Sequence, residues 1–178
     1  MKEGFNDLLP NLTTMRFLFI IIFTFFSIHS IISQEMNAEK LLEIIQQESD
    51  TLKTSGNTYQ FLIKDVMLIC IFDENANRMR IVSPIIEREK IGEEELLNAL
   101  VANFHSALDV KYALSDEVIW SVFIHPLEQL TEEQVIDAIK QVYTAAITFG
   151  GSYSSTNLVF PGNTKKKEKT LPKILKKT

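Results

Sequence analysis

The sequence predicts an α+β domain in which a five-stranded antiparallel sheet is combined with three helices, in the order α-β-β-β-α-β-β-α. Three observations lead to this fold class. Three segments carry apolar residues at the three- and four-residue spacing of amphipathic helices, and five short apolar runs lie between them. Within each group of strands the links are short, which requires antiparallel pairing. No glycine-rich phosphate loop opens a helix, so a nucleotide-binding crossover is not indicated.

The first helix is predicted over residues 35–56, EMNAEKLLEIIQQESDTLKTSG. Leu41, Ile44, Ile45 and Leu52 recur at helical spacing and form an apolar stripe, and Gly56 provides a stop. We therefore expect one helix to fill this segment.

Three strands are predicted next, over residues 58–63, 66–72 and 79–84. Lys64 and Asp65 form a tight turn between the first two strands. The second link, DENANR at residues 73–78, has turn chemistry, because Asp and Asn tolerate left-handed backbone and bond to their own neighbours.

The second helix is predicted over residues 92–108, GEEELLNALVANFHSAL. Glu93, Glu94 and Glu95 lie in its first turn, where carboxylates favour the positive end of the helix dipole. The face expected to pack on the core consists of Leu96, Leu97, Leu100, Val101 and Phe104.

A second hairpin is predicted from residues 110–115 and 118–124. In its last strand Val118, Trp120, Val122 and Ile124 share one side, and we expect this side to face the core. The capping box TEEQ, residues 131–134, then opens a third helix that ends at Gly150 and Gly151.

Residues 1–33 have the layout of a secretory signal peptide. Arg16 precedes ten largely apolar residues, FLFIIIFTFF, and a cleavage point lies between Ser33 and Gln34. Met15 directly precedes Arg16, so it is a candidate for the true start. We expect an exported protein, periplasmic or extracellular, and the alternative is a leader that is retained as a membrane anchor.

The charge is unevenly distributed along the chain. Residues 164–178 hold seven lysines and one glutamate, whereas the leader is neutral, so a chain of net charge −5 has a body, residues 34–163, of charge −11. An acidic body argues against nucleic acid as a partner. Residues 34–151 are predicted to form the domain and residues 152–178 a flexible basic tail, for which weak contact with a membrane surface is an alternative role.

No cluster of residues indicates catalysis, a cofactor or a metal. Cys70 is the only cysteine and lies in an apolar run, which favours a buried thiol. His125 and His105 are the only histidines outside the leader, and they lack metal-ligand spacing. The alternative hypothesis is a small hydrolase or metal-dependent enzyme that uses His125 or His105.

A surface for a partner is predicted on the sheet instead. Met67, Ile69 and Ile71 lie on the opposite side of their strand from Leu68, Cys70 and Phe72. With Ile119 and Phe123 they are expected to form a second apolar face that three helices do not easily cover. This face would bind a polypeptide partner or a second copy of the chain in a homodimer.

The element order and the run from Asn98 to Phe149 resemble YbjN-like domains and the type III secretion chaperone-like fold of the Tir chaperone type. Asn103 and Phe104, near the end of the second helix, and Thr131 to Glu133, at the start of the last one, carry the resemblance, which covers about residues 36–149. It implies a non-enzymatic, often dimeric α+β protein that holds other polypeptides. The sequence as a whole thus predicts an exported chaperone-like or accessory protein.

Overall fold

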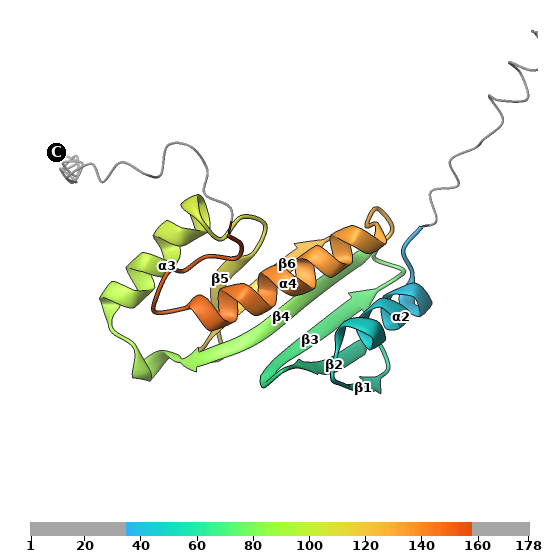
Figure 1. Cartoon of the computed structure of the whole chain (residues 1–178), viewed down its shortest axis with the longest axis horizontal. Coiled ribbons are helices and arrows are strands. Elements are labelled where there is room, and N and C mark those ends of the chain that lie inside the picture. The colour runs from blue at the N-terminus through green and yellow to red at the C-terminus, as the bar shows by residue number, and fades with distance from the viewer. Residues whose placement is uncertain (1–34, 158–178) are drawn as a thin grey trace, which may run out of the picture. The chain divides into compact units, whose positions relative to one another are not determined.

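The computed structural model of the protein describes residues 35–157, so the predicted leader at 1–33 and most of the predicted tail, residues 158–178, lie outside the described residues. The first residues of that tail, 152–157, are described, and Tyr153 and Ser155 among them are buried. Three α-helices, one 3-10 turn and six strands follow one another along this part of the chain (Figure 1). In order they are α2 (Ala38–Glu48), β1 (Thr51–Ser55), β2 (Thr58–Ile63), β3 (Val66–Asp73), β4 (Arg78–Glu87), η1 (Arg88–Lys90), α3 (Glu93–His105), β5 (Lys111–Ser115), β6 (Val118–His125) and α4 (Glu132–Thr148).

The six strands form one antiparallel sheet in the order β1-β2-β3-β4-β6-β5. The first four strands form a meander, whereas α3 carries the chain from β4 to the edge strand β5. Strand β6 then returns between β4 and β5. Helix α4 lies across β3, β4 and β6, and α2 packs beside it over β1 and β2 (Figure 1).

The α+β class and the three helices are confirmed, but the prediction of five strands is wrong, because residues 51–55 form β1 rather than the end of the first helix. The helix ends at Glu48, and the Asp50 amide donates to the Leu62 carbonyl at 2.9 Å. Gly56, with a φ of +53°, and Asn57 form a two-residue link between β1 and β2. A glycine at the first position of such a link favours a hairpin over a helix stop.

The predicted turns are confirmed. Lys64 adopts a φ of +53° between the paired residues Ile63 and Val66. At the next turn the Asp73 carboxylate accepts a hydrogen bond from the Ala76 amide at 2.9 Å, and Asn77 has a φ of +48°. Both positions use the tolerance of polar residues for the left-handed region.

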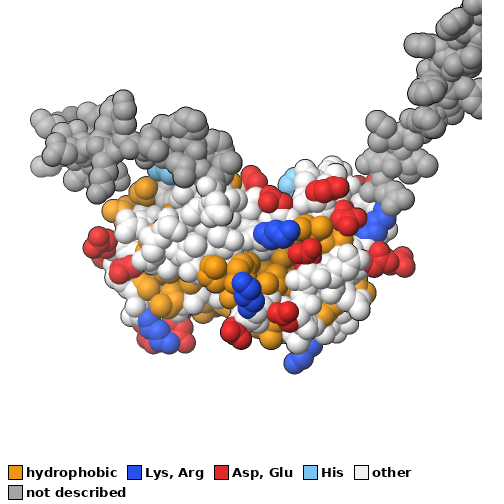
Figure 2. Space-filling model, in the orientation of Figure 1, with side chains coloured by type: hydrophobic (Ala, Val, Ile, Leu, Met, Phe, Trp, Pro, Cys, Tyr) orange, Lys and Arg blue, Asp and Glu red, His pale blue; other side chains and the backbone are white. Residues whose placement is uncertain are grey.

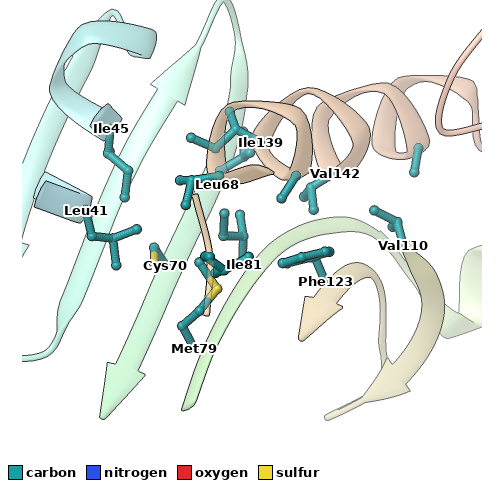
Figure 3. Packing of buried hydrophobic residues seen from close by; sticks show 14 of the residues in the cluster. Leu41, Ile45, Leu68, Cys70, Met79, Ile81, Val110, Phe123, Ile139 and Val142 are labelled. Atoms are coloured by element: carbon teal, nitrogen blue, oxygen red, sulfur yellow. The ribbon is translucent and has the colours of Figure 1, made fainter. Parts of the chain in front are cut away.

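The core lies between the sheet and the two helices α2 and α4. Figure 3 shows side chains from α2, β3, β4, β6 and α4 meeting in this layer. Leu41 and Ile45 of α2, Leu68 of β3, Ile81 of β4 and Ile139 of α4 are all fully buried. Two hydroxyl groups also link the sheet to α4: Ser121 Oγ donates to the Val142 carbonyl at 3.0 Å, and the Tyr112 hydroxyl to the Ala145 carbonyl at 3.0 Å.

The edge of the sheet at β5 is blocked by a side chain. Asn103 of α3 accepts a hydrogen bond from the Tyr112 amide at 2.7 Å and donates one to the Tyr112 carbonyl at 3.1 Å. Both backbone groups of this edge residue are therefore satisfied by one side-chain amide. An edge strand capped in this way is a poor template for the addition of another strand.

We expect Ile81→Ala to lower the free energy of unfolding by about 2–5 kcal/mol, because Ile81 is fully buried at the centre of the sheet. The measurement is chemical denaturation of the full chain. Ile124→Ala serves as the control, since Ile124 is 64% exposed, and it should change stability by less than about 0.5 kcal/mol. Equal losses in both variants would contradict the assignment of the two faces.

Candidate functional site

One face of the sheet carries the helices, and the other, here named the open face, is apolar without a helix over it within residues 35–157. Its apolar side chains are half-buried by one another, except for Ile124, which is exposed. The apolar residues of the open face are Leu62, Met67, Ile69, Ile71, Val82, Pro84, Val118, Trp120, Val122 and Ile124. The register also places Gln60 opposite Ile69, and Arg80 between Ile71 and Ile124, on this face. A large exposed apolar surface on a folded protein often marks a site at which a partner binds.

The pairing register brings the open-face residues together from three strands. Ile69 lies opposite Val82, which in turn lies opposite Val122. One row further along, Pro84 lies opposite Trp120. The Trp120 Nε1–H donates to the Ser115 carbonyl at 3.1 Å, so its one polar group is satisfied while the indole ring remains part of the surface.

The partner face predicted from the sequence is only partly correct. Met67, Ile69 and Ile71 do lie on the open face, whereas Ile119 and Phe123 are 2% and 7% exposed and face the helices. The register explains the difference, because Phe123 lies opposite Ile81, and Ile81 lies opposite the buried Cys70. The same register shows that the prediction of a core-facing side is wrong for Val118, Trp120, Val122 and Ile124, which lie on the open face.

Two buried serines explain why the more hydrophobic side of β6 faces away from the helices. Ser83 and Ser121 are fully buried on the helix side of β4 and β6. Ser121 Oγ donates to the Val142 carbonyl of α4, so a small polar residue lies at this contact between the helix and the sheet. The inner face of β6 is thus less hydrophobic than its outer face, contrary to the usual pattern.

A second apolar surface lies on α3. The predicted core-facing residues Leu97, Leu100 and Phe104 are 60%, 66% and 86% exposed, and the helix buries Ala99 and Ala102 instead. The prediction is therefore wrong for these three residues, whereas Leu96 and Val101 are half-buried. The three exposed residues follow helical spacing and form one stripe, here named the α3 stripe. Small residues on the buried side let α3 lie close to the edge of the sheet.

His125 lines a cavity of about 470 Å³ at the end of β6, together with Asp109 and Asp137. Its Nδ1 lies 2.8 Å from the Pro126 carbonyl oxygen, and its ring is stacked near that of Phe123. Nδ1 must carry the hydrogen in this contact, because a carbonyl only accepts. The ring is thus held by backbone and aromatic contacts rather than by the hydroxyl or carboxylate that the hydrolase alternative requires.

His105 is the last residue of α3, and its ring meets the Phe104 ring edge-on at 4.8 Å. It lies on a different element from His125, so the two histidines do not form one site. Within residues 35–157 no group of three His, Cys, Asp or Glu side chains has a geometry that would hold a metal ion. No helix in that range has the length and hydropathy needed to cross a membrane.

Cys70 is fully buried between α2 and the sheet, as its apolar surroundings in the sequence predict. Burial raises the pKa of the Cys70 thiol to about 12, because the thiolate would lose its hydration. The reactive form is therefore scarce at neutral pH.

Comparison with solved structures shows which known fold the chain resembles. No protein-family model and no curated protein sequence matches the chain. Among solved structures, a chain of the HopA1–SchA chaperone–effector complex is 14% identical, with a TM-score of 0.50 over 62% of this chain and 91% of that one. The fold is type III secretion chaperone-like.

Two further structures are similar. A chain of the ExsC–ExsE complex is 14% identical, with a TM-score of 0.49 over 61% of this chain and 86% of that one. A chain of the complex between the Yersinia pestis type III secretion chaperone SycH and a fragment of YscM2 is 12% identical, with a TM-score of 0.48 over 63% and 98%. The likeness to YbjN-like domains stays a prediction.

We expect Cys70 to resist alkylation by iodoacetamide at pH 8 in the folded protein and to react fully in denaturant. The reason is that folding both buries the sulfur and suppresses the thiolate. Intact-mass spectrometry after timed quenching measures the label. Rapid labelling of the folded protein would contradict the burial of Cys70.

Proposed function

We propose that this protein is an exported, non-enzymatic chaperone-like protein that binds a polypeptide partner, in extended form, on the open face of its sheet. The observation that carries the proposal is the largely apolar surface built from β2, β3, β4 and β6, in which Arg80 is the charged residue between Ile71 and Ile124. Removing such a surface from water is favourable by roughly 25 cal/mol per Å². An extended segment presents alternate side chains to one side, which suits the flat surface of a sheet.

The capped edge favours this mode of binding over strand addition. Asn103 occupies both backbone groups of Tyr112 at the β5 edge, and β1, at the other edge, has only five residues. A partner therefore gains more from the side chains of the open face than from backbone pairing at either edge. The chaperone-like fold supports the same class of function.

Self-association is assigned to the α3 stripe rather than to the sheet. Leu97, Leu100 and Phe104 are the most exposed apolar residues of the helix, and a two-fold axis would place the stripe of one copy against that of another. Helices pair readily through apolar stripes of this spacing. A homodimer formed in this way leaves the open face of each copy accessible to the polypeptide partner.

Export is proposed because residues 1–33 have the layout of a secretory signal peptide. The compact unit starts at Glu35, and its first buried residue is Met36. Cleavage after Ser33 would leave Glu35 and Met36, the first residues that the structure describes, in the mature chain. The product would reach the periplasm or the extracellular space.

Binding of a peptide should change the fluorescence of Trp120, the only tryptophan of the chain, because it lies on the open face. We expect the tryptophan-free peptide Gly-Ser-Ile-Thr-Leu-Ser-Ile-Ser-Gly to shift the emission to shorter wavelength in a saturable titration. In Val122→Lys the dissociation constant should rise about tenfold or more, because a bound segment would desolvate the ammonium group.

Thr54→Lys is the matched control, since Thr54 is exposed and its partner Tyr59 faces the helices. This variant adds the same charge on the other side of the sheet and should bind the peptide as the parent does. Equal weakening in both variants, or no spectral change with the parent, would contradict binding at the open face.

Leu100→Glu should convert a dimer into a monomer in multi-angle light scattering, because it places a carboxylate in the centre of the α3 stripe. Ile147→Glu provides the control, since Ile147 is 54% exposed but belongs to α4. A parent protein that is monomeric at high micromolar concentration would refute the assignment of the stripe to self-association.

The mature protein should begin at Gln34 when it is purified from the exported fraction, because the signal peptide is expected to end at Ser33. Mass spectrometry of the amino-terminal peptide measures this directly. A terminus at Met1 or Met15 in the membrane fraction would instead support the retained anchor and a membrane-tethered accessory factor.

A further inference from the structure

The cavity at the end of β6 arises from a difference in strand length. Pairing between β5 and β6 begins at Lys111 and Val122, so β6 continues past its neighbour through Phe123, Ile124 and His125. The turn before β5 and the first half of α4 close the space that remains. Phe123, Leu130 and Ala138 give the cavity an apolar floor, and Asp109 and Asp137 add carboxylates.

A buried amide holds these two carboxylates together. Gln141 of α4 is only 3% exposed, and its Nε2 donates to Asp137 Oδ2 at 2.6 Å and to Asp109 Oδ2 at 3.2 Å. Its Oε1 in turn accepts a hydrogen bond from Ser155 Oγ at 3.3 Å, which fixes the amide in this orientation. Two like charges are thus brought side by side by a single nitrogen, although they repel each other.

The described part of the chain supplies no cation to this pair. Within residues 35–157 the ion pairs include neither Asp109 nor Asp137. The two basic residues of the lining bond elsewhere: Lys111 directs its Nζ to the Leu108 carbonyl, and His125 Nδ1 lies against the Pro126 carbonyl. A lysine or arginine cation placed between the two carboxylates would relieve their repulsion and donate hydrogen bonds to several of their oxygens.

The cavity also adjoins the open face. Ile124, which is 64% exposed, lines both this cavity and a hollow of about 480 Å³ that includes Ile71 and Arg80. A segment bound across the open face would pass over Ile124. Only a long side chain would then reach around the end of β6 to the carboxylates.

We propose that this cavity binds a lysine or arginine side chain of the polypeptide partner, with the aliphatic stem against Phe123 and Leu130 and the charged end between Asp109 and Asp137. This inference rests on the proposed function and adds the class of partner: a segment with apolar residues and a basic residue on the same side. The charge of −11 on residues 34–163 favours the same partner, and Figure 2 shows acidic side chains spread over the side in view.

The cavity is tested first with n-butylammonium chloride, which reproduces a lysine side chain, by titration of the full-length ¹⁵N-labelled protein in two-dimensional NMR. We expect amide shifts centred on residues 109, 123–125 and 137, and about fivefold weaker binding in both Asp109→Asn and Asp137→Asn. Asparagine keeps an acceptor for the Gln141 amide, so the fold is retained. Asp65→Asn, at an exposed turn, removes the same charge elsewhere and should bind as the parent does.

n-Butanol separates charge recognition from simple apolar binding. If it shifts the same amides with equal affinity, or if both asparagine variants bind butylammonium as the parent does, the assignment of a cation site is overturned. Neither outcome depends on whether the protein binds polypeptides.

The partner class is tested with two peptides that replace the last isoleucine of the earlier peptide by lysine or by norleucine, which has the same stem without the charge. We expect the lysine peptide to bind about fivefold more tightly, and this preference to disappear in Asp137→Asn. Equal binding of both peptides to the parent would overturn the inference and leave the proposed function standing. Absence of binding by either peptide, with butylammonium still bound, would instead refute the proposed function.

Discussion

The sheet is covered on one side only, and most features of this protein depend on that asymmetry. Helices α2 and α4 lie over the same face, with Ser121 allowing α4 to bond directly to the sheet through the Val142 carbonyl. Most large core residues therefore belong to one cluster. Strands β3 and β6 nevertheless carry apolar side chains on both sides, because three helices cannot surround a sheet of six strands. The apolar side chains on the other side of the sheet have no helix over them and can contact a partner.

The β5 edge of the sheet is capped by a side chain, whereas the open face is accessible. The Asn103 side chain bonds the backbone of Tyr112 where a neighbouring strand would otherwise pair. Asn103 belongs to α3, and the same helix exposes Leu97, Leu100 and Phe104 to solvent. This arrangement suppresses uncontrolled growth of the sheet through its backbone and leaves side-chain surfaces accessible. The resemblance seen in the sequence at Asn103 and Phe104 thus involves one residue that closes an edge and one that creates an exposed surface.

Apart from β1, the order of elements could be predicted, as could the turns and the burial of Cys70, because each has a local signal, such as the capping box at Thr131 or the Asn and Asp residues of the β3–β4 turn. Strand β1 is not predicted because Leu52 also fits the apolar stripe of the preceding helix. The Gly56–Asn57 pair, however, is typical of a β-hairpin turn. The sides of β6 could not be assigned, because both are apolar and only its register with Ile81 and Val82 decides. No sequence pattern indicates that Asp109, Asp137 and Gln141 lie together, because Asp109 is far from the other two in sequence and meets them only after folding.

The position of the α3 stripe, on a different element from the open face, has a consequence for affinity. Two copies joined through α3 would each present one binding face to the same long chain. Once one face is occupied, the second meets its segment at an effective concentration set by the intervening linker, which reaches the millimolar range for short flexible connections. Two weak contacts of this kind can retain a client tightly and still release it stepwise.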